Sequence, residues 1–269
     1  MQSTCFKLAS VLFGLFCLSA LAKPTIVQVG SPLVNGNQLT PFSAQWDQFS
    51  TVEGQRVKSA TYQETLEIVT IDDIEQLKHV QVVNDQSGTQ VTNTTYFDRV
   101  TLKPLNIEQR MKGVPKGTPD NRTFKFADKQ YDVTVIMPDK KTHSRTVHMP
   151  VNMFNVSNLG LVFAAMPLEL GAKYRMPSAF PQYQDGMYWM DVSVSGEKTF
   201  KNQDGMQTQA WQVDIHWINI KEGDEYPAGP TQSGGAYYIA KKGSKGIPPV
   251  PAYVNDSIAI EVSFAEVKK

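Results

Sequence analysis

The chain has 269 residues, of which 41% are hydrophobic and 19% charged, and its 26 Lys and Arg balance 26 Asp and Glu. Because the chain has no excess of positive charge, the composition argues against a protein that binds nucleic acid or an anionic membrane through a basic surface. A chain of this length can bury a stable core without disulfides.

The first 22 residues have the pattern of a secretory signal peptide. Lys7 supplies the positive start, the run from Leu8 to Leu21 is apolar, and Ala20-Leu21-Ala22 is a small-residue cleavage site. The apolar run is too short for a stable membrane span. We therefore expect cleavage after Ala22, export to the periplasm of a Gram-negative bacterium, and a mature protein that is not integral to the membrane.

Both cysteines, Cys5 and Cys17, lie in this segment. The mature chain is thus expected to contain no thiol for catalysis or metal binding. Sequons of the form Asn-x-Ser/Thr begin at Asn93, Asn121 and Asn155 and again near the C-terminus, at Asn255. They act as glycan acceptors only in a eukaryotic secretory route.

The remaining chain alternates apolar and polar residues in short segments separated by turn residues. This pattern predicts an all-β fold, either an antiparallel β-barrel or a strongly curved β-sandwich. Residues 23–58 are expected to form an N-terminal arm and the first strand or strands, and residues 59–269 a single antiparallel β domain. The expected strands are Tyr62–Ile71, Leu77–Val83, Gln90–Leu102, Arg122–Phe126, Gln130–Met137, Ser144–Met149, Met187–Phe200, Met206–Ile220, Ala236–Lys241 and Ser257–Val267.

One stretch interrupts this alternation, because the chain is apolar from Leu159 to Met166. We expect one short helix at residues 157–166, capped by Ser157 and ended by Pro167, with Gly171 at the following turn. A helix that is apolar all round is usually buried. A plug at one end of the barrel is therefore favoured over the alternative, a lid above an apolar ligand.

The strands expected at residues 187–200 and 206–220 form a hairpin around the tight-turn signal Asp204-Gly205. In the second strand, Trp211, Val213, Ile215 and Trp217 share one face and the intervening polar residues share the other. The sequence leaves open which face is core. Two further stretches are expected as loops, namely residues 223–230 and the proline-rich Ile247–Pro251.

The signatures of several common enzyme classes are missing from the sequence, among them Gly-x-Ser-x-Gly, His-Glu-x-x-His and the phosphate-binding loops. Asp214 and His216 project from one face of a strand, and this carboxylate and imidazole could together act as the general base of a hydrolase. This is the last of three functional hypotheses. No metal site and no cofactor are expected.

Three stretches together are similar to a known family. They are residues 97–104 (FDRVTLKP), residues 161–177 with the segment MPLELG, and residues 192–213, which contain VSVSGE, Asp204-Gly205 and AWQV. In this order they resemble the exported bacterial proteins catalogued as domain of unknown function 3108, over about residues 60–260. The resemblance implies a β-rich, barrel-like periplasmic protein. It carries no established activity, so it assigns no catalytic residue.

The first functional hypothesis is a non-enzymatic envelope protein that binds an apolar or amphipathic small molecule inside the barrel. The second is an assembly protein that holds other envelope proteins through strand edges and the proline-rich loop. No particular protein partner is indicated. The residues expected to bind a lipophilic ligand are Leu159, Leu161, Phe163, Met166, Tyr188, Met190, Trp211 and Trp217.

Overall fold

The computed structural model describes residues 23–182, 186–201, 205, 207–219, 232–243 and 248–266. The expected signal peptide with its cleavage site, the turn residue Asp204 and the loop at 223–230 lie outside these ranges. Within the described part of the chain, none of the helices is long and apolar enough to cross a membrane.

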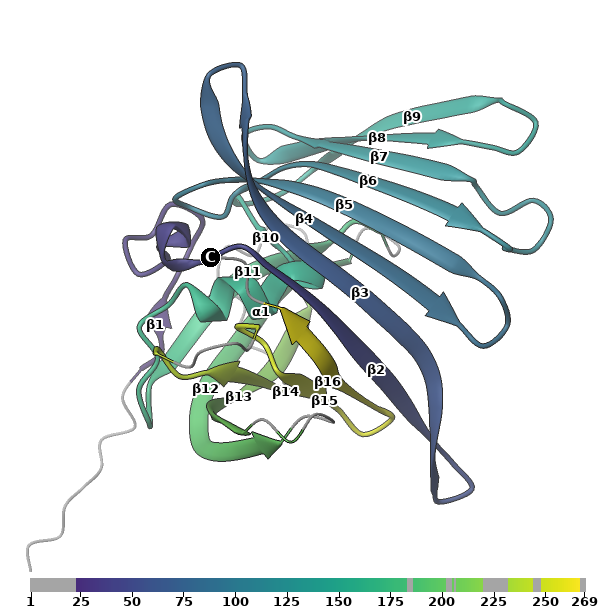
Figure 1. Ribbon diagram of the computed structural model, residues 1–269. Coiled ribbons are helices and arrows are strands. Elements are labelled where there is room, and N and C mark those ends of the chain that lie inside the picture. The colour runs from purple at the N-terminus through teal and green to yellow at the C-terminus, as the bar shows by residue number, and fades with distance from the viewer. Residues whose placement is uncertain are drawn as a thin grey trace, which may run out of the picture.

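The described residues form an all-β fold built on one 16-stranded sheet (Figure 1). Its order is β1-β11-β12-β13-β14-β15-β16-β2-β3-β4-β5-β6-β7-β8-β9, with β10 also paired to β11. The strands are β1 (Thr25–Ile26), β2 (Phe42–Val52), β3 (Gln55–Ile71), β4 (Ile74–Asp85), β5 (Gln90–Asp98), β6 (Pro104–Lys112), β7 (Asn121–Phe126), β8 (Gln130–Ile136), β9 (Thr142–His148), β10 (Phe154–Asn155), β11 (Lys173–Phe180), β12 (Gly186–Lys201), β13 (Gln207–Asn219), β14 (Gln232–Ala240), β15 (Ala252–Val254) and β16 (Ile258–Glu266). Neighbours are antiparallel, except that β1 and β10 run parallel to β11.

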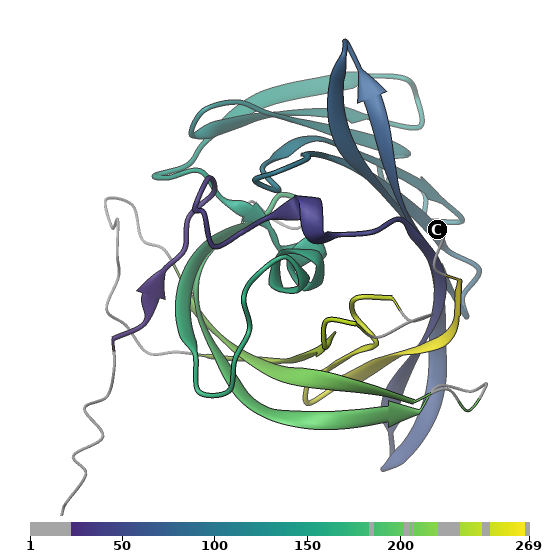
Figure 2. The same ribbon diagram turned by 60° about the vertical axis from the view of Figure 1, so that its left-hand side comes forward.

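The sheet rolls up into a barrel-like body that is not closed by backbone pairing. Figure 2 shows the strands curving around α1 (Leu159–Ala164), the one α-helix among the described residues. Side chains bridge the open side instead, because Ile107, Phe124 and Tyr131 of β6–β8 pack in one buried cluster with Ala179 of β11. The fold prediction of a barrel-like all-β body is therefore confirmed.

Bulges help the sheet to curve, since an extra residue in one strand increases the local twist. One lies where β13 and β14 shift register between Ile215 and His216. The opposite strand carries two glycines there. Gly235 has a φ of 94°, and a Cβ at Gly234 would collide with the indole of Trp217. Only glycine therefore fits at this bend.

The hairpin of β12 and β13 matches the expected one closely, and the structure decides which face is core. Val213 and Ile215 are 0% and 1% exposed and belong to the main core cluster. Trp211 and Trp217 pack against that cluster from the same face. The apolar face thus points into the roll, and the face with Asp214 and His216 points outward.

Sequence patterns missed four of the strands, namely β6, β10, β11 and β15, and misjudged the ends of others. The strand expected to reach Leu102 stops at Asp98, whose side-chain Oδ1 accepts the backbone N–H of Thr101 at 2.7 Å and closes a turn. β6 begins with a proline and alternates weakly, β11 contains Pro177, and β10 and β15 have only 2 and 3 residues.

The expected helix is present, but its cap differs from the prediction. A 3-10 turn, η2 (Val156–Asn158), precedes α1, and a second such turn, η1 (Gly36–Gln38), lies near the N-terminus. Ser157 is not the cap: Asn155 caps η2, because its side chain accepts the backbone N–H of Ser157 at 3.3 Å, and α1 itself follows Asn158, which makes no side-chain cap bond. Asparagine caps this way because its oxygen reaches the second N–H of the turn.

The helix is buried on all sides, as the plug interpretation requires. Leu159 and Phe163 are 0% exposed, and Val162 is 2% exposed. It ends ahead of Pro167, and Gly171 has a φ of 85° in the turn that follows.

We predict that Leu159→Ala lowers the free energy of unfolding by about 2–5 kcal/mol, because it opens a cavity in a filled core. Leu170→Ala is the matched control, since Leu170 is 62% exposed. Urea unfolding followed by circular dichroism measures both variants. Equal stability of the two would show that α1 is not an integral part of the core.

Candidate functional site

A cavity of about 630 Å³ lies inside the roll, between the inner faces of β3–β5 and the N-terminal part of α1. Aromatic rings form a large part of its wall, and Tyr188 and Trp217 contact each other edge to face at 5.4 Å between ring centroids. The aromatic residues of the wall are Trp46, Tyr62, Phe180, Tyr188, Trp217, Tyr237 and Tyr253.

The wall formed by the sheet carries one row of polar side chains between apolar ones. In register, Glu64 of β3 lies opposite Gln81 of β4, and Gln81 lies opposite Asn93 of β5. Because side chains alternate along each strand, all of them point into the cavity. The neighbouring row on one side consists of Tyr62 and the paired valines of β4 and β5.

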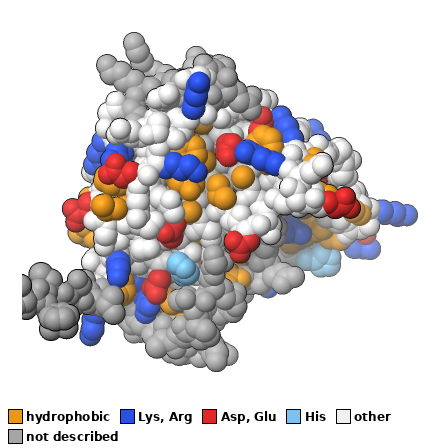
Figure 3. Space-filling model, turned by 90° about the horizontal axis from the view of Figure 1, so that it is seen from below, with side chains coloured by type: hydrophobic (Ala, Val, Ile, Leu, Met, Phe, Trp, Pro, Cys, Tyr) orange, Lys and Arg blue, Asp and Glu red, His pale blue; other side chains and the backbone are white. Residues whose placement is uncertain are grey.

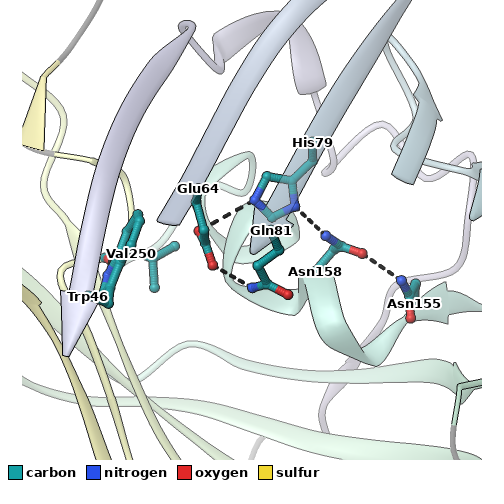
Figure 4. Close-up of polar contacts among 7 residues, drawn as sticks. All are labelled: Trp46, Glu64, His79, Gln81, Asn155, Asn158 and Val250. Atoms are coloured by element: carbon teal, nitrogen blue, oxygen red, sulfur yellow. Dashed lines mark hydrogen bonds and ion pairs between the residues drawn. The ribbon is translucent and has the colours of Figure 1, made fainter. Parts of the chain in front are cut away.

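The carboxylate of Glu64 receives two side-chain donors (Figure 4). Gln81 Nε2 donates to Oε1, and His79 Nε2 lies 3.4 Å from Oε2. The Glu64 side chain is 15% exposed, whereas that of His79 is 3% exposed. Each carboxylate oxygen accepts more than one hydrogen bond. The carboxylate therefore keeps capacity to accept a donor from the cavity.

A chain of hydrogen bonds continues from His79 into the helix region. Asn158 Nδ2 lies 2.6 Å from His79 Nδ1, and Asn155 Nδ2 donates to Asn158 Oδ1 at 2.5 Å. The cap bond from the Ser157 N–H to Asn155 fixes the orientation of the first amide. That amide in turn fixes the orientation of Asn158, whose NH₂ then faces the imidazole.

The direction of this chain assigns the tautomer of His79. Because Asn158 donates to Nδ1, that nitrogen is an acceptor, and the ring proton is on Nε2, facing Glu64. Glu64 is the one acidic residue on the cavity wall among the described residues. We call the series Asn155, Asn158, His79 and Glu64 the polar relay.

Two tyrosines on the opposite wall stay neutral. Burial, and after it the nearby Tyr253 and Glu64, raise the pKa of Tyr237 far above its ordinary value. Burial also raises the pKa of Tyr253, against the opposing effect of a hydrogen bond from Asn255. The two rings lie 4.7 Å apart between centroids. They offer the cavity faces and hydroxyls but no charge.

The proline-rich segment is part of the cavity wall. Trp46 Nε1 donates to the carbonyl of Val250 at 3.0 Å, and the Pro249 and Pro251 carbonyls accept the N–H groups of Ala240 and Val262 at 2.9 and 2.8 Å. Figure 4 shows the Trp46 and Val250 side chains beside the polar relay. The described residues of this loop, 248–251, are thus bound within the molecule.

Three residues predicted to bind a ligand line this cavity, namely Leu161, Tyr188 and Trp217. Leu159 and Met190, which were predicted with them, are fully buried in the core at 0% exposure.

The other predicted ligand-binding residues line a second cavity of about 620 Å³. Phe163, Met166 and Trp211 form part of it, at the C-terminal end of α1. Glu169 and Lys242 also line this second cavity, so both ends of the helix contribute to a cavity wall.

Asp214 and His216 lie away from both cavities, on the outer face of β13. His216 is exposed, and Asp214 Oδ1 accepts the side-chain amide of Gln212 at 2.9 Å. Among the residues described, three or more His, Asp or Glu side chains nowhere gather in a way that could hold a metal ion.

Sequence reasoning missed Glu64, His79, Gln81 and Asn158. The available signal was a polar residue at an inward position of an otherwise apolar face. On β3, Glu64 falls two residues before the buried Leu66, so both point the same way. Only the strand register brings these polar positions together.

The comparison with protein families decides the affiliation of the chain. The sequence model described as "Protein of unknown function (DUF3108)" matches residues 42–244. The chain belongs to this family. The description of the family gives no activity, and a comparison with curated proteins finds no match.

A solved structure supports the fold of this DUF3108 member. The crystal structure of a β-barrel-like protein of domain of unknown function DUF1849 from Brucella abortus is similar, with a TM-score of 0.50 and 13% sequence identity. The similarity covers 88% of this chain and 100% of that chain. At this identity it supports the fold alone.

The first stretch that carried the family resemblance has a structural role. In the turn between β5 and β6, the Arg99 guanidinium donates to the carbonyls of Gly36, Asn37 and Leu39 around η1. Leu102 in the same turn is 2% exposed. The turn therefore anchors the N-terminal segment to the roll.

We predict that Asn158→Ala destabilises the protein by about 1–3 kcal/mol, because it leaves the amide of Asn155 and Nδ1 of His79 buried without this partner. Asn37→Ala, at an exposed position, serves as the control and should be near neutral. Chemical denaturation compares the two. A neutral Asn158→Ala would mean that water replaces the relay at no cost.

Proposed function

We propose that the protein is an exported, non-enzymatic binding protein that holds an amphipathic small molecule in the cavity of the rolled sheet. The observation that carries the proposal is a partly open cavity of about 630 Å³ whose wall combines aromatic side chains with a row of polar ones. Known small-molecule sites are of this size and kind, mostly apolar with a few convergent polar groups.

The two parts of the wall suit two parts of one ligand. The rings and valines would bury an apolar body, which is favourable by about 25 cal/mol per Å² removed from water. Glu64, Gln81 and Asn93 would orient a polar end, since buried polar groups need hydrogen-bond partners. A ligand with only one of these parts would leave either the apolar or the polar side chains of the cavity wall without a complementary contact.

Export is proposed from the sequence of residues 1–22, with its charged start, apolar run and small-residue cleavage site. A mature chain without cysteines can work in an oxidising compartment. The periplasm is the location that we propose, and it agrees with the periplasmic location that the family resemblance implies.

An assembly role is the alternative, and one feature favours it. β9 is the last strand in the sheet order, and six of its seven residues, all except Val147, are exposed. An edge strand of this kind can pair with a strand of another protein. The basic and histidine side chains of β9 are equally compatible with an edge strand that faces solvent and pairs with no other protein.

A variant that fills the cavity tests the proposed function. Val91 lines the cavity from β5, whereas the next residue, Thr92, points to the other face of the strand. We predict that Val91→Trp weakens binding of the neutral amphiphile N-phenyl-1-naphthylamine about tenfold or more, because the indole occupies the ligand volume. Thr92→Trp is the matched control and should bind like the wild type.

The measurement is the increase in probe fluorescence on titration, with thermal unfolding as a check on folding. If the wild type does not bind the probe, or if Val91→Trp and Thr92→Trp bind it equally, the cavity is not the binding site.

A further inference from the structure

The charge of the cavity wall narrows the class of ligand. Among its described residues, Glu64 is acidic and no Lys or Arg is present. The surface outside is different. Figure 3 shows Lys and Arg side chains interspersed with Asp and Glu side chains over the outer face seen from below. The single sign inside is therefore a property of the cavity and not of the protein as a whole.

The polar relay orients the donors that reach this carboxylate. With Nδ1 of His79 facing the side-chain amide of Asn158, the Nε2 atom of the ring faces Glu64. Asn155 and the helix cap keep Asn158 in the required orientation.

Aromatic side chains line the same cavity as this carboxylate. Tyr62 lies two residues before Glu64 on β3 and so points to the same side, and Trp46 is its register partner on β2. Tyr237 lies near enough for the Glu64 charge to affect its hydroxyl. Rings around a carboxylate attract a cation through their negative faces, most strongly when water is excluded.

We infer that the cavity selects amphiphiles with a cationic head group, such as an alkylammonium, with Glu64 as the counter-ion and Tyr62, Trp46 and Tyr237 around the head. This inference rests on the proposed function. An anionic amphiphile such as a fatty acid would bring a second negative charge to a wall that lacks a basic group among its described residues. Burying such a like-charged pair is costly.

Three probes with one alkyl chain test this selection, namely decylammonium, 1-decanol and decanoate, each below its micelle concentration. Calorimetric titration, with Trp fluorescence as a second readout, gives their dissociation constants. We expect decylammonium to bind about tenfold or more tightly than 1-decanol, because a hydrogen bond to a charged group is worth more than a neutral one. Decanoate should bind more weakly than 1-decanol.

Glu64→Gln should remove the advantage of decylammonium and retain 1-decanol binding, because glutamine keeps the size and an acceptor for His79. Glu67→Gln is the matched control. It removes an acidic group from the same strand, but residue 67 points to the opposite face and its carboxylate pairs with Lys78 at 3.8 Å. This control should leave the order of the three probes unchanged.

The outcomes separate the two proposals. Equal binding of the three probes, or tightest binding of decanoate, would overturn the cationic selection and leave the binding cavity intact. Loss of selectivity in Glu67→Gln as well would overturn the role of Glu64. Binding of none of the probes would contradict the proposed function itself. If Glu64→Gln does not fold, the order of the probes on the wild type still decides.

Discussion

The hydrogen bonds that run from the cap of η2 to Glu64 are the constraint on which the cavity depends. They join a buried helix, which has apolar contacts on every side, to the polar row of the sheet. Apolar packing alone would not fix how α1 is rotated, because hydrophobic contacts are non-directional. Hydrogen bonds have defined geometry. The bond between Asn158 and His79 therefore fixes the N-terminal end of α1 against the wall of the cavity.

The rolled sheet makes such an interior available. A closed barrel of few strands fills its inside with side chains. This sheet stays unpaired between its two end strands, β9 and β1, and is closed by the side chains of residues such as Phe124 and Tyr131. The helix occupies part of the larger interior. What it leaves is divided between a cavity at its N-terminal end, with Gly160 in the wall, and another at its C-terminal end, with Ala164.

Much of the fold was accessible from the sequence, because it rests on local signals. The β12–β13 hairpin follows from strict alternation, and the helix follows from the run between Leu159 and Met166. The cap of η2 at Asn155 was missed because Ser157, two residues later, could serve equally well on pattern alone. β6 was missed because it begins with a proline and because polar residues separate its few apolar ones, a pattern that also fits a loop.

The site was harder to predict for a physical reason. Its apolar half was found in part, since Leu161, Tyr188 and Trp217 carry the hydrophobic signal and do line the cavity. Its polar half depends on register across β3, β4 and β5, and on a contact between His79 and Asn158, which are 79 residues apart in sequence. Asp214 and His216 stood out because they are close in sequence, yet they project from the outer face of the roll.

The central claim is that the cavity holds a small amphipathic molecule. Native mass spectrometry of the protein, purified without detergent from its own host, tests it most directly. The account predicts a population heavier than the polypeptide by the mass of one small molecule, which returns to the polypeptide mass after extraction with organic solvent. A single species at the bare polypeptide mass before extraction would contradict it.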